Sequence, residues 1–141
     1  MHLIAPIREY CASMDALPAA LDLIEDTCRR AGLGPATYLR AQLAVEELFT
    51  NSVRHGYGGD SRQLIWLSAS TEGSCITLTY QDAAPPYNPA APDQSRLSLP
   101  VEQRPVGGLG ISLIAGVSQS VEYARSGGRN TVVLKIAAPD A

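Results

Sequence analysis

The sequence lacks the features that mark membrane-spanning, exported and disulfide-stabilised proteins. No apolar run approaches the roughly 20 residues that a membrane-spanning helix needs. The N-terminus contains no cationic stretch followed by an apolar core, so no export signal is predicted. The cysteines, Cys11, Cys28 and Cys75, are odd in number and lack the spacing of a metal site, which disfavours a disulfide framework. We therefore expect a cytoplasmic protein that does not associate with membranes.

Positive charge is also sparse. The chain has 11 lysine and arginine residues against 14 aspartate and glutamate residues, which gives a net charge of −3. The basic residues are scattered and form no stripe of the kind that binds a duplex, so nucleic acid is not an expected partner. With 141 residues, 45% of them hydrophobic and 18% charged, the chain is expected to form a single globular domain, 1–141.

Two helices are predicted in the N-terminal half. Residues 15–31 place apolar side chains at spacings of three and four, with Asp15 as the N-terminal cap and Gly32 as the terminator. A second and longer helix is expected to begin near Pro35, because proline suits the first position of a helix. It is expected to end at the glycine-rich segment 56–59.

The other segments read as short strands, turns and one long loop. The predicted strands are 2–8, 63–71, 74–81, 119–125 and 130–137. Residues 83–106 contain six prolines and little periodicity, which predicts a long loop of the kind that often forms a lid. A short helix is expected to follow from Gly107. This order predicts an α+β fold, a two-layer sandwich of a mixed, mostly antiparallel sheet with about three helices on one face.

The second helix carries four polar side chains on one face: Glu47, Asn51, Arg54 and His55. Since each helical residue turns by about 100°, they fall within roughly a quarter of the circumference. A carboxylate can accept a hydroxyl proton, an amide oxygen can ligate Mg²⁺ and a guanidinium can bind phosphate, which are the components of phosphoryl transfer. Such residues are also common on the solvated face of an amphipathic helix, so the face alone fits either interpretation.

Two further segments are candidate ligand sites. Residues 107–110 (Gly-Gly-Leu-Gly) offer backbone N–H groups near a helix N-terminus, which can bind an anion or can simply mark the start of the helix. They lack the lysine and hydroxyl residue of a Walker P-loop. Asp82 ends an apolar strand, where it can accept from an exocyclic amine or form a turn.

Together and in this order, the three motifs resemble those of the GHKL (Bergerat-fold) ATPase/kinase superfamily. Residues 45–57 are similar to its N box, 82–89 to its G1 box and 107–111 to its G2 box. The compact length and the residues of the N box are most similar to the anti-sigma-factor serine/threonine kinases of bacterial partner-switching systems. Ala84 departs from the G1 pattern, which usually has glycine there.

The resemblance implies a role for each candidate residue. Glu47 would be the general base, Asn51 the Mg²⁺ ligand, and Arg54 and His55 neighbours of the ATP phosphates or ribose. Asp82 would bind the adenine amine, and Ala84, two residues later, would belong to the same cofactor-binding set. Gly108, Leu109 and Gly110 would line the phosphates beneath a lid at about 83–106, and Thr131 would help to hold the adenine pocket.

The resemblance further implies an ATP- and Mg²⁺-dependent protein serine/threonine kinase. It would act as an anti-sigma factor or switch protein, would phosphorylate a small STAS-type anti-sigma-factor antagonist, and would bind a sigma factor in the alternative complex. A homodimer is also implied.

Two other hypotheses remain open from the sequence. The first is a non-catalytic module of the same fold that sequesters a regulatory protein. The methyl group of Ala84 favours it, because that group would narrow the adenine pocket or, at a position that requires positive φ, shift the backbone. The second is the detached catalytic domain of a histidine kinase. It is less expected, since no dimerisation helix with a phosphorylatable histidine precedes the motifs.

Overall fold

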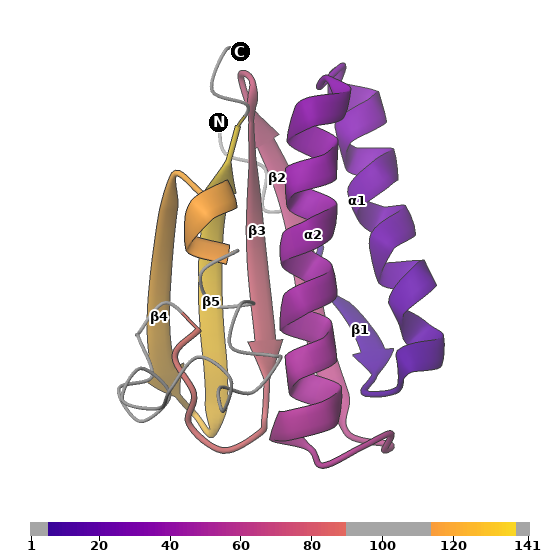
Figure 1. Cartoon of the computed structure of the whole chain (residues 1–141), viewed down its shortest axis with the longest axis vertical. Helices are drawn as coiled ribbons and strands as arrows, with labels where there is room; N and C mark the ends of the chain where they lie inside the picture. Colours follow the sequence, from indigo (N-terminus) through magenta and orange to yellow (C-terminus); the bar gives the residue numbers. More distant parts are fainter. Residues whose placement is uncertain (1–5, 90–113, 138–141) are drawn as a thin grey trace, which may run out of the picture.

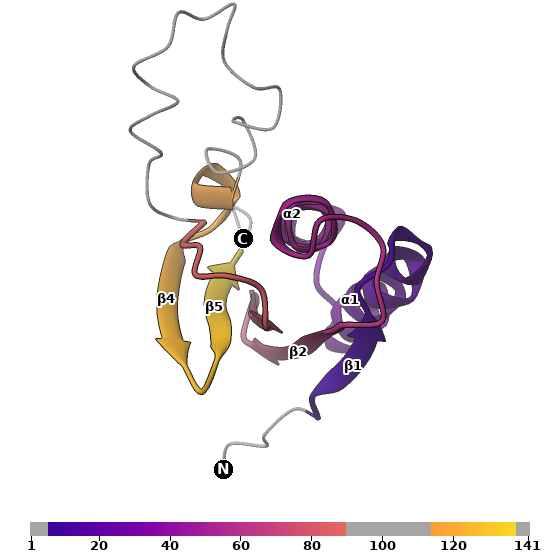
Figure 2. The same cartoon turned by 90° about the horizontal axis from the view of Figure 1, so that it is seen from below.

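The computed structural model describes residues 6–89 and 114–137. Its elements in chain order are β1 (Arg8–Cys11), the 3-10 helix η1 (Met14–Ala16), α1 (Leu17–Ala31), α2 (Pro35–Asn51), the π-helical turn η2 (Ser52–Gly56), β2 (Leu64–Glu72), β3 (Cys75–Asp82), β4 (Ser120–Ser126) and β5 (Arg129–Ile136). A further helical turn occupies residues 114–117. The helices form one layer and the strands the other (Figures 1 and 2). The predicted α+β sandwich is confirmed.

The sheet has the order β1-β2-β3-β5-β4, and every neighbouring pair is antiparallel. The mixed sheet expected from the sequence is therefore a purely antiparallel one within the described strands. In the hairpin formed by β4 and β5, it is β5 that pairs with β3, so β4 is an edge strand of the sheet. Of the strand expected at 2–8, residues 2–5 lie outside the described residues, and residues 6 and 7 belong to no strand. The first described strand is Arg8–Cys11, which pairs with β2 from Arg8↔Leu67 to Cys11↔Leu64.

Helix α1 is bounded by local hydrogen bonds. The N-cap of α1 is Ala16, which makes no side-chain capping bond, and not the expected Asp15. Ser13 caps the preceding turn η1, where its hydroxyl accepts from the Asp15 amide at 3.4 Å. At the other end Gly32 adopts φ 69°, a left-handed conformation that glycine adopts without steric cost, and its N–H caps the last carbonyls. The predicted terminator is thus confirmed.

Helix α2 packs its small and apolar face against the sheet. Its buried residues are Thr37, Ala41, Ala44, Val45, Leu48 and Phe49. After Asn51 the α-helix gives way to the wider turn η2, in which the Tyr57 amide donates to the Ser52 carbonyl at 2.8 Å. Turns of this kind are rare and often occur at functional sites. The helix therefore ends in an irregular segment near the C-terminal end of β3.

The core lies between the two layers, and strand alternation supplies its sheet side. In β3 the buried side chains are Ile76, Leu78, Tyr80 and Asp82, and in β5 they are Asn130, Val132, Leu134 and Ile136. Asp82 and Asn130 are directly opposed in the register. Each row of buried apolar residues therefore ends, at the same edge of the core, in a polar side chain.

The helical turn 114–117 belongs to the helix layer as well. Ile114 is fully buried and is part of the same core cluster as the residues of α1 and α2. Three helical segments thus cover one face, as expected from the sequence.

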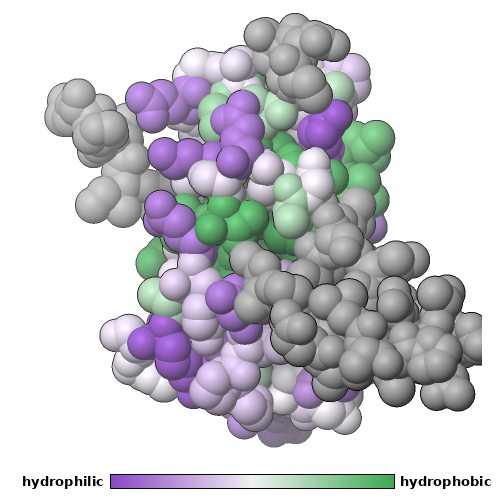
Figure 3. All heavy atoms as spheres, turned by 60° about the vertical axis from the view of Figure 1, so that its left-hand side comes forward, coloured by the Kyte–Doolittle hydropathy of each residue, from purple (hydrophilic) through white to green (hydrophobic). Residues whose placement is uncertain are grey.

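Large apolar side chains are mostly enclosed. Among the described residues, the exposed ones are Ile7, Leu39 and Tyr87. Seen from the β4 side, hydrophobic side chains form several patches across the middle of the surface, and hydrophilic side chains lie above and below them (Figure 3). In the described part of the chain, no helix has the length and apolar character to cross a lipid bilayer.

The layer arrangement predicts which leucines stabilise the fold. We expect Leu78→Ala to lower the free energy of unfolding by about 2–5 kcal/mol, because Leu78 is fully buried and its removal leaves a cavity. The same change at Leu39, which is 54% exposed, should cost less than about 0.5 kcal/mol. Urea unfolding followed by circular dichroism measures both values. Equal losses would contradict the described packing.

Candidate functional site

A cavity of about 220 Å³ lies between the C-terminal end of the helix layer and the sheet. Its lining residues are Leu48, Asn51, Ser52, His55 and Gly56 from the helix, Tyr80, Asp82, Asn130 and Val132 from the strands, and Ala84, Pro85, Pro86, Tyr87 and Pro89 from the loop after β3. Most of the wall is apolar, with a few polar groups that converge on one point. This pattern is typical of small-molecule sites.

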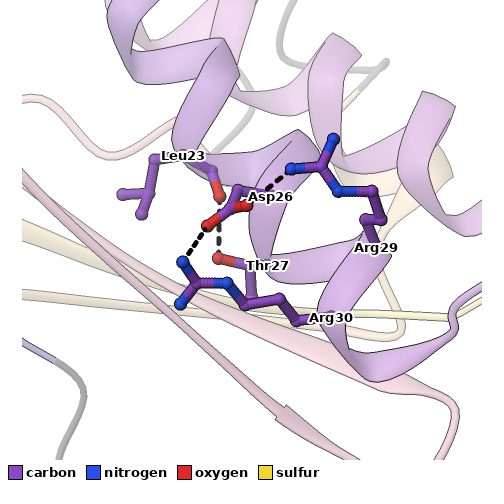
Figure 4. Close-up of polar contacts among 5 residues, drawn as sticks. All are labelled: Leu23, Asp26, Thr27, Arg29 and Arg30. Carbon is purple, nitrogen blue, oxygen red and sulfur yellow. Dashed lines mark hydrogen bonds and ion pairs between the residues drawn. The ribbon is translucent and has the colours of Figure 1, made fainter.

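A second hollow, between β1 and α1, has a different character. It is lined by charged residues, among them Arg8, Asp22 and Asp26. The Asp26 carboxylate is already engaged by Arg29 at 2.8 Å and Arg30 at 3.0 Å on the exposed surface of α1 (Figure 4). Exposed ion pairs of this kind contribute little energy. The first cavity, with its buried polar groups, is therefore the candidate site.

Asp82 is the centre of the candidate site and is only 8% exposed. Its Oδ2 accepts a hydrogen bond from the Ser52 hydroxyl at 2.6 Å. Its Oδ1 accepts from Asn130 Nδ2 at 2.8 Å and from the Ala84 amide at 3.3 Å. A carboxylate offers about four acceptor positions, so the donors among residues 6–89 and 114–137 leave about one position unused, on Oδ2. That position can accept an N–H group of a ligand.

Tyr80 contacts Ser52, one of the donors to Asp82, and so stabilises the hydrogen bonds around Asp82. Its hydroxyl lies 2.6 Å from Ser52 Oγ and donates to the Leu48 carbonyl at 3.0 Å. Complete burial raises the pKa of Tyr80 well above its ordinary value, an effect that the nearby Asp82 charge reinforces and the hydrogen bond with Ser52 opposes. The hydroxyl therefore stays protonated at neutral pH and keeps donating to the helix.

Ala84 fits the site because residue 56 is glycine. A Cβ atom built on Gly56 would lie 2.8 Å from the Ala84 Cβ atom, closer than two such atoms can approach. No described residue other than glycine has a positive φ, so Ala84 adopts an ordinary backbone conformation. The condition for a backbone shift, a position that requires positive φ, is therefore not met at Ala84, whereas the methyl group does line the cavity.

The predicted polar face of the helix and the cavity overlap only in part. Asn51 and His55 line the cavity, whereas Glu47 and Arg54 do not. Glu47 is half-buried one turn before Asn51, and Arg54 is exposed. The reason is rotational: with about 100° per residue, Glu47 and Arg54 lie on the outer side of Asn51, and the sheet is on its other side.

Thr131 does not face the cavity. It is paired with Gln81 in the register, and its hydroxyl accepts from Gln81 Nε2 at 3.1 Å on the sheet face away from the helices. Because successive strand residues point to opposite faces, the cavity position belongs to Asn130, one residue earlier. The pocket role expected of Thr131 is therefore corrected to Asn130. Gly108, Leu109 and Gly110 lie outside the described residues.

Sequence reasoning missed three polar residues that immobilise Asp82: Ser52, Tyr80 and Asn130. The available signal was the parity of the strands. Counting back by twos from Ile136 along the buried row of β5 leads to Asn130, a polar residue at a core position. A polar residue at a buried strand position needs hydrogen-bond partners, so it indicates a cluster of polar side chains at that end of the strand.

Comparison with known proteins gives one family match and several structural likenesses. The model of the family described as "Histidine kinase-like ATPase domain" matches residues 11–136. A search of curated proteins found no match.

Three solved structures illustrate the shared fold. The RsbU and RsbW domains of Rv1364c from Mycobacterium tuberculosis match with a TM-score of 0.61 and 17% identity, over 95% of this chain and 33% of that chain. This chain thus spans one third of that structure's length. The SiaB-SiaC complex from Pseudomonas aeruginosa matches with a TM-score of 0.58 and 13% identity, over 94% and 89% of the two chains. The catalytic domain of the histidine kinase ThkA matches with a TM-score of 0.51 and 12% identity, over 94% and 95%.

The contact between residues 56 and 84 predicts a dependence of one substitution on the other. Gly56→Ala alone should lower the free energy of unfolding by about 1–3 kcal/mol, because the added methyl group overlaps with Ala84. In an Ala84→Gly background the same change should be neutral or stabilise by up to about 1 kcal/mol, since alanine is preferred to glycine within a helix. Denaturant unfolding of the four proteins tests this. An identical effect in both backgrounds would rule out the contact.

Tyr80 predicts a pH dependence of stability. Its pKa is higher in the folded protein than the value of about 10 in the unfolded chain, so its contribution is fully present below about pH 10 and is lost as the pH rises further. We expect the free energy of unfolding to fall in that range, and less steeply in Tyr80→Phe, which has no hydroxyl to titrate. The comparison requires unfolding curves of both proteins at several alkaline pH values. Parallel pH profiles would contradict this assignment.

Proposed function

Because the chain belongs to the histidine kinase-like ATPase domain family, we propose that its cavity binds ATP, with the adenine against Asp82 and the phosphates directed towards Asn51. The observation that carries this proposal is the buried carboxylate with about one unused acceptor position. The exocyclic amine of adenine is a donor of the required kind. The apolar wall around Pro85, Pro86 and Val132 suits the flat faces of a purine.

The phosphate end lies at the opposite side of the cavity, near the outer face of the helix. Asn51 offers an amide oxygen, and the Glu47 carboxylate lies one turn away on the same helix. Such oxygen donors fit Mg²⁺, which proteins usually hold with one or two side chains together with substrate phosphates. When bound, the ion would neutralise charge on the phosphates. His55 is exposed and lines the cavity, and its proposed role is to contact the ribose or the phosphates.

We further propose that the protein is a serine/threonine kinase. Glu47 lies on the outer side of Asn51, where the hydroxyl of a second protein would approach the γ-phosphate from solvent. Its carboxylate accepts the hydroxyl proton as the hydroxyl oxygen bonds to the γ-phosphorus. The bond between that phosphorus and the bridging oxygen breaks, and ADP leaves with the electron pair. The proposed role of Arg54, whose side chain is exposed, is to stabilise charge on the transferring group.

The partner follows from the resemblance of the sequence and from the structural likenesses. An RsbW domain from Mycobacterium tuberculosis and a chain of the SiaB-SiaC complex from Pseudomonas aeruginosa share this fold. The proposed substrate is therefore a small STAS-type anti-sigma-factor antagonist, and the alternative partner is a sigma factor. The alternative is a non-catalytic module of the same fold that sequesters a regulatory protein, and the observation that favours it is the Ala84 methyl group in the wall of the cavity.

Phosphoryl transfer can be tested with one matched pair of variants. With labelled ATP, Mg²⁺ and the antagonist encoded beside its gene, the wild type should produce phosphoserine or phosphothreonine. Glu47→Gln should reduce the rate by about 10²- to 10⁴-fold, the usual contribution of a general base, while ATP affinity changes little. Glu46→Gln is the control, since it makes the same charge change on the neighbouring residue, whose carboxylate accepts from Gln42.

The outcomes of this experiment separate the two parts of the proposal. ATP binding without any phosphorylated product in the wild type would overturn the kinase assignment and leave a nucleotide-binding module. Equal losses in Glu46→Gln and Glu47→Gln would contradict the role of Glu47. Absence of ATP binding in calorimetry would overturn the proposed function as a whole.

A further inference from the structure

We propose that Asn130 is a positioning residue of the nucleotide site, which holds the Asp82 carboxylate and the loop wall 84–87 in one fixed relation and so sets the selectivity for a base with an exocyclic amine. This inference rests on the proposed binding of ATP in the same cavity. It concerns a residue for which the sequence motifs assign no role.

The side chain of Asn130 connects five groups from three parts of the chain. It is only 5% exposed. Its Nδ2 lies 2.8 Å from Asp82 Oδ1, 3.0 Å from the Pro85 carbonyl and 3.2 Å from the Ala84 carbonyl. Its Oδ1 accepts from the Tyr123 hydroxyl at 2.6 Å and from the Tyr87 amide at 3.2 Å. Asn130 thus joins the end of β3, the following loop and the edge strand β4.

The neighbours determine which way the Asn130 amide points. All three groups near Nδ2 are acceptors, and both groups near Oδ1 are donors. The reversed amide would place an oxygen against the Asp82 carboxylate and two carbonyls, which is repulsive. The orientation of the side chain is therefore specified by the hydrogen-bond network.

The Asn130 side chain has no capacity left for a ligand. Its two N–H donors are shared among three acceptors, and the two lone pairs of its oxygen each have a donor. Asn130 consequently acts on a nucleotide through other groups. It turns the Asp82 carboxylate so that the unused position on Oδ2 faces the cavity, and it holds the Ala84 and Pro85 carbonyls back from that position.

Loss of Asn130 should loosen the site without unfolding the protein. The loop has a second attachment, because Arg125 on β4 donates to the Ala84 carbonyl at 2.6 Å. Asp82 also keeps its bond from Ser52. The expected effect is therefore a carboxylate and a loop wall that sample more orientations, which weakens the contact with the amine in particular.

The test compares ATP with ITP, whose base carries a carbonyl in place of the exocyclic amine. Calorimetry with Mg²⁺ should show that the wild type prefers ATP. In Asn130→Ala the ATP affinity should fall about tenfold, the equivalent of one hydrogen bond to a charged group, while ITP affinity changes less, so that the ATP/ITP ratio falls. Asn130→Asp should lower the ratio further, because a second carboxylate then faces Asp82. Val133→Thr, a change of similar volume on the opposite sheet face of the same strand, is the control and should leave both affinities within about twofold.

A second variant keeps the test decisive if Asn130→Ala does not fold. Tyr123→Phe removes only the hydroxyl that donates to Asn130 Oδ1, and it should lower the ATP/ITP ratio in the same direction by a smaller factor. A ratio that stays at the wild-type value in the folded variants overturns the inference and leaves ATP binding intact. A wild type that binds no ATP, or binds ATP and ITP equally, overturns the proposed function and this inference with it.

Discussion

The buried Asp82 carboxylate requires hydrogen-bond donors, and the helix layer, the sheet and the loop after β3 each supply one. An ionised group that is 8% exposed is costly unless donors surround it. Here the donors come from the helix layer through Ser52, from β5 through Asn130 and from the loop backbone at Ala84. The two layers and the loop are therefore tied together at one point. Because the same point lines the cavity, the interactions that stabilise the fold there also shape the candidate binding site.

The end of the helix layer can be understood from the same requirement. Ser52 is the first residue of the π-helical turn, and its hydroxyl contacts both Asp82 and Tyr80. Tyr80 in turn donates to the carbonyl of Leu48, one turn earlier. The regular helix therefore stops where its residues must satisfy groups of the sheet. Asn51, the last residue of the regular helix, is thus held between the buried side chains of Ser52 and Asp82 and the half-buried Glu47.

Periodicity in the sequence located most of the fold. The predicted strands 63–71 and 74–81 lie within one residue of Leu64–Glu72 and Cys75–Asp82, because alternation of buried side chains is a strong local signal. The first described strand begins at Arg8, the last residue of the predicted strand 2–8, since its pairing with β2, a contact distant in sequence, decides its position. The helix face was only partly assigned, because periodicity groups residues on a face but does not reveal which side of that face meets the sheet.

The residues that line the cavity were likewise only partly identified from the sequence. Asn51, His55, Asp82 and Ala84 were singled out from the sequence and line the cavity. Asn130 was missed in favour of Thr131, since a one-residue difference in a strand reverses the face, and only the register with Asp82 identifies the residue that points inwards. The hydrogen bonds of Tyr80 and Ser52 depend on tertiary contacts between residues 28 positions apart, which no local pattern encodes.

The close approach of Gly56 and Ala84 also limits the order in which this chain can change over evolutionary time. An alanine at position 84 is compatible only with a residue at position 56 that has no side chain. Once that alanine is present, any larger residue at position 56 meets its methyl group. A side chain at position 56 is therefore accommodated more easily once position 84 has lost its methyl group, so the alanine narrows the set of mutational paths open to its partner.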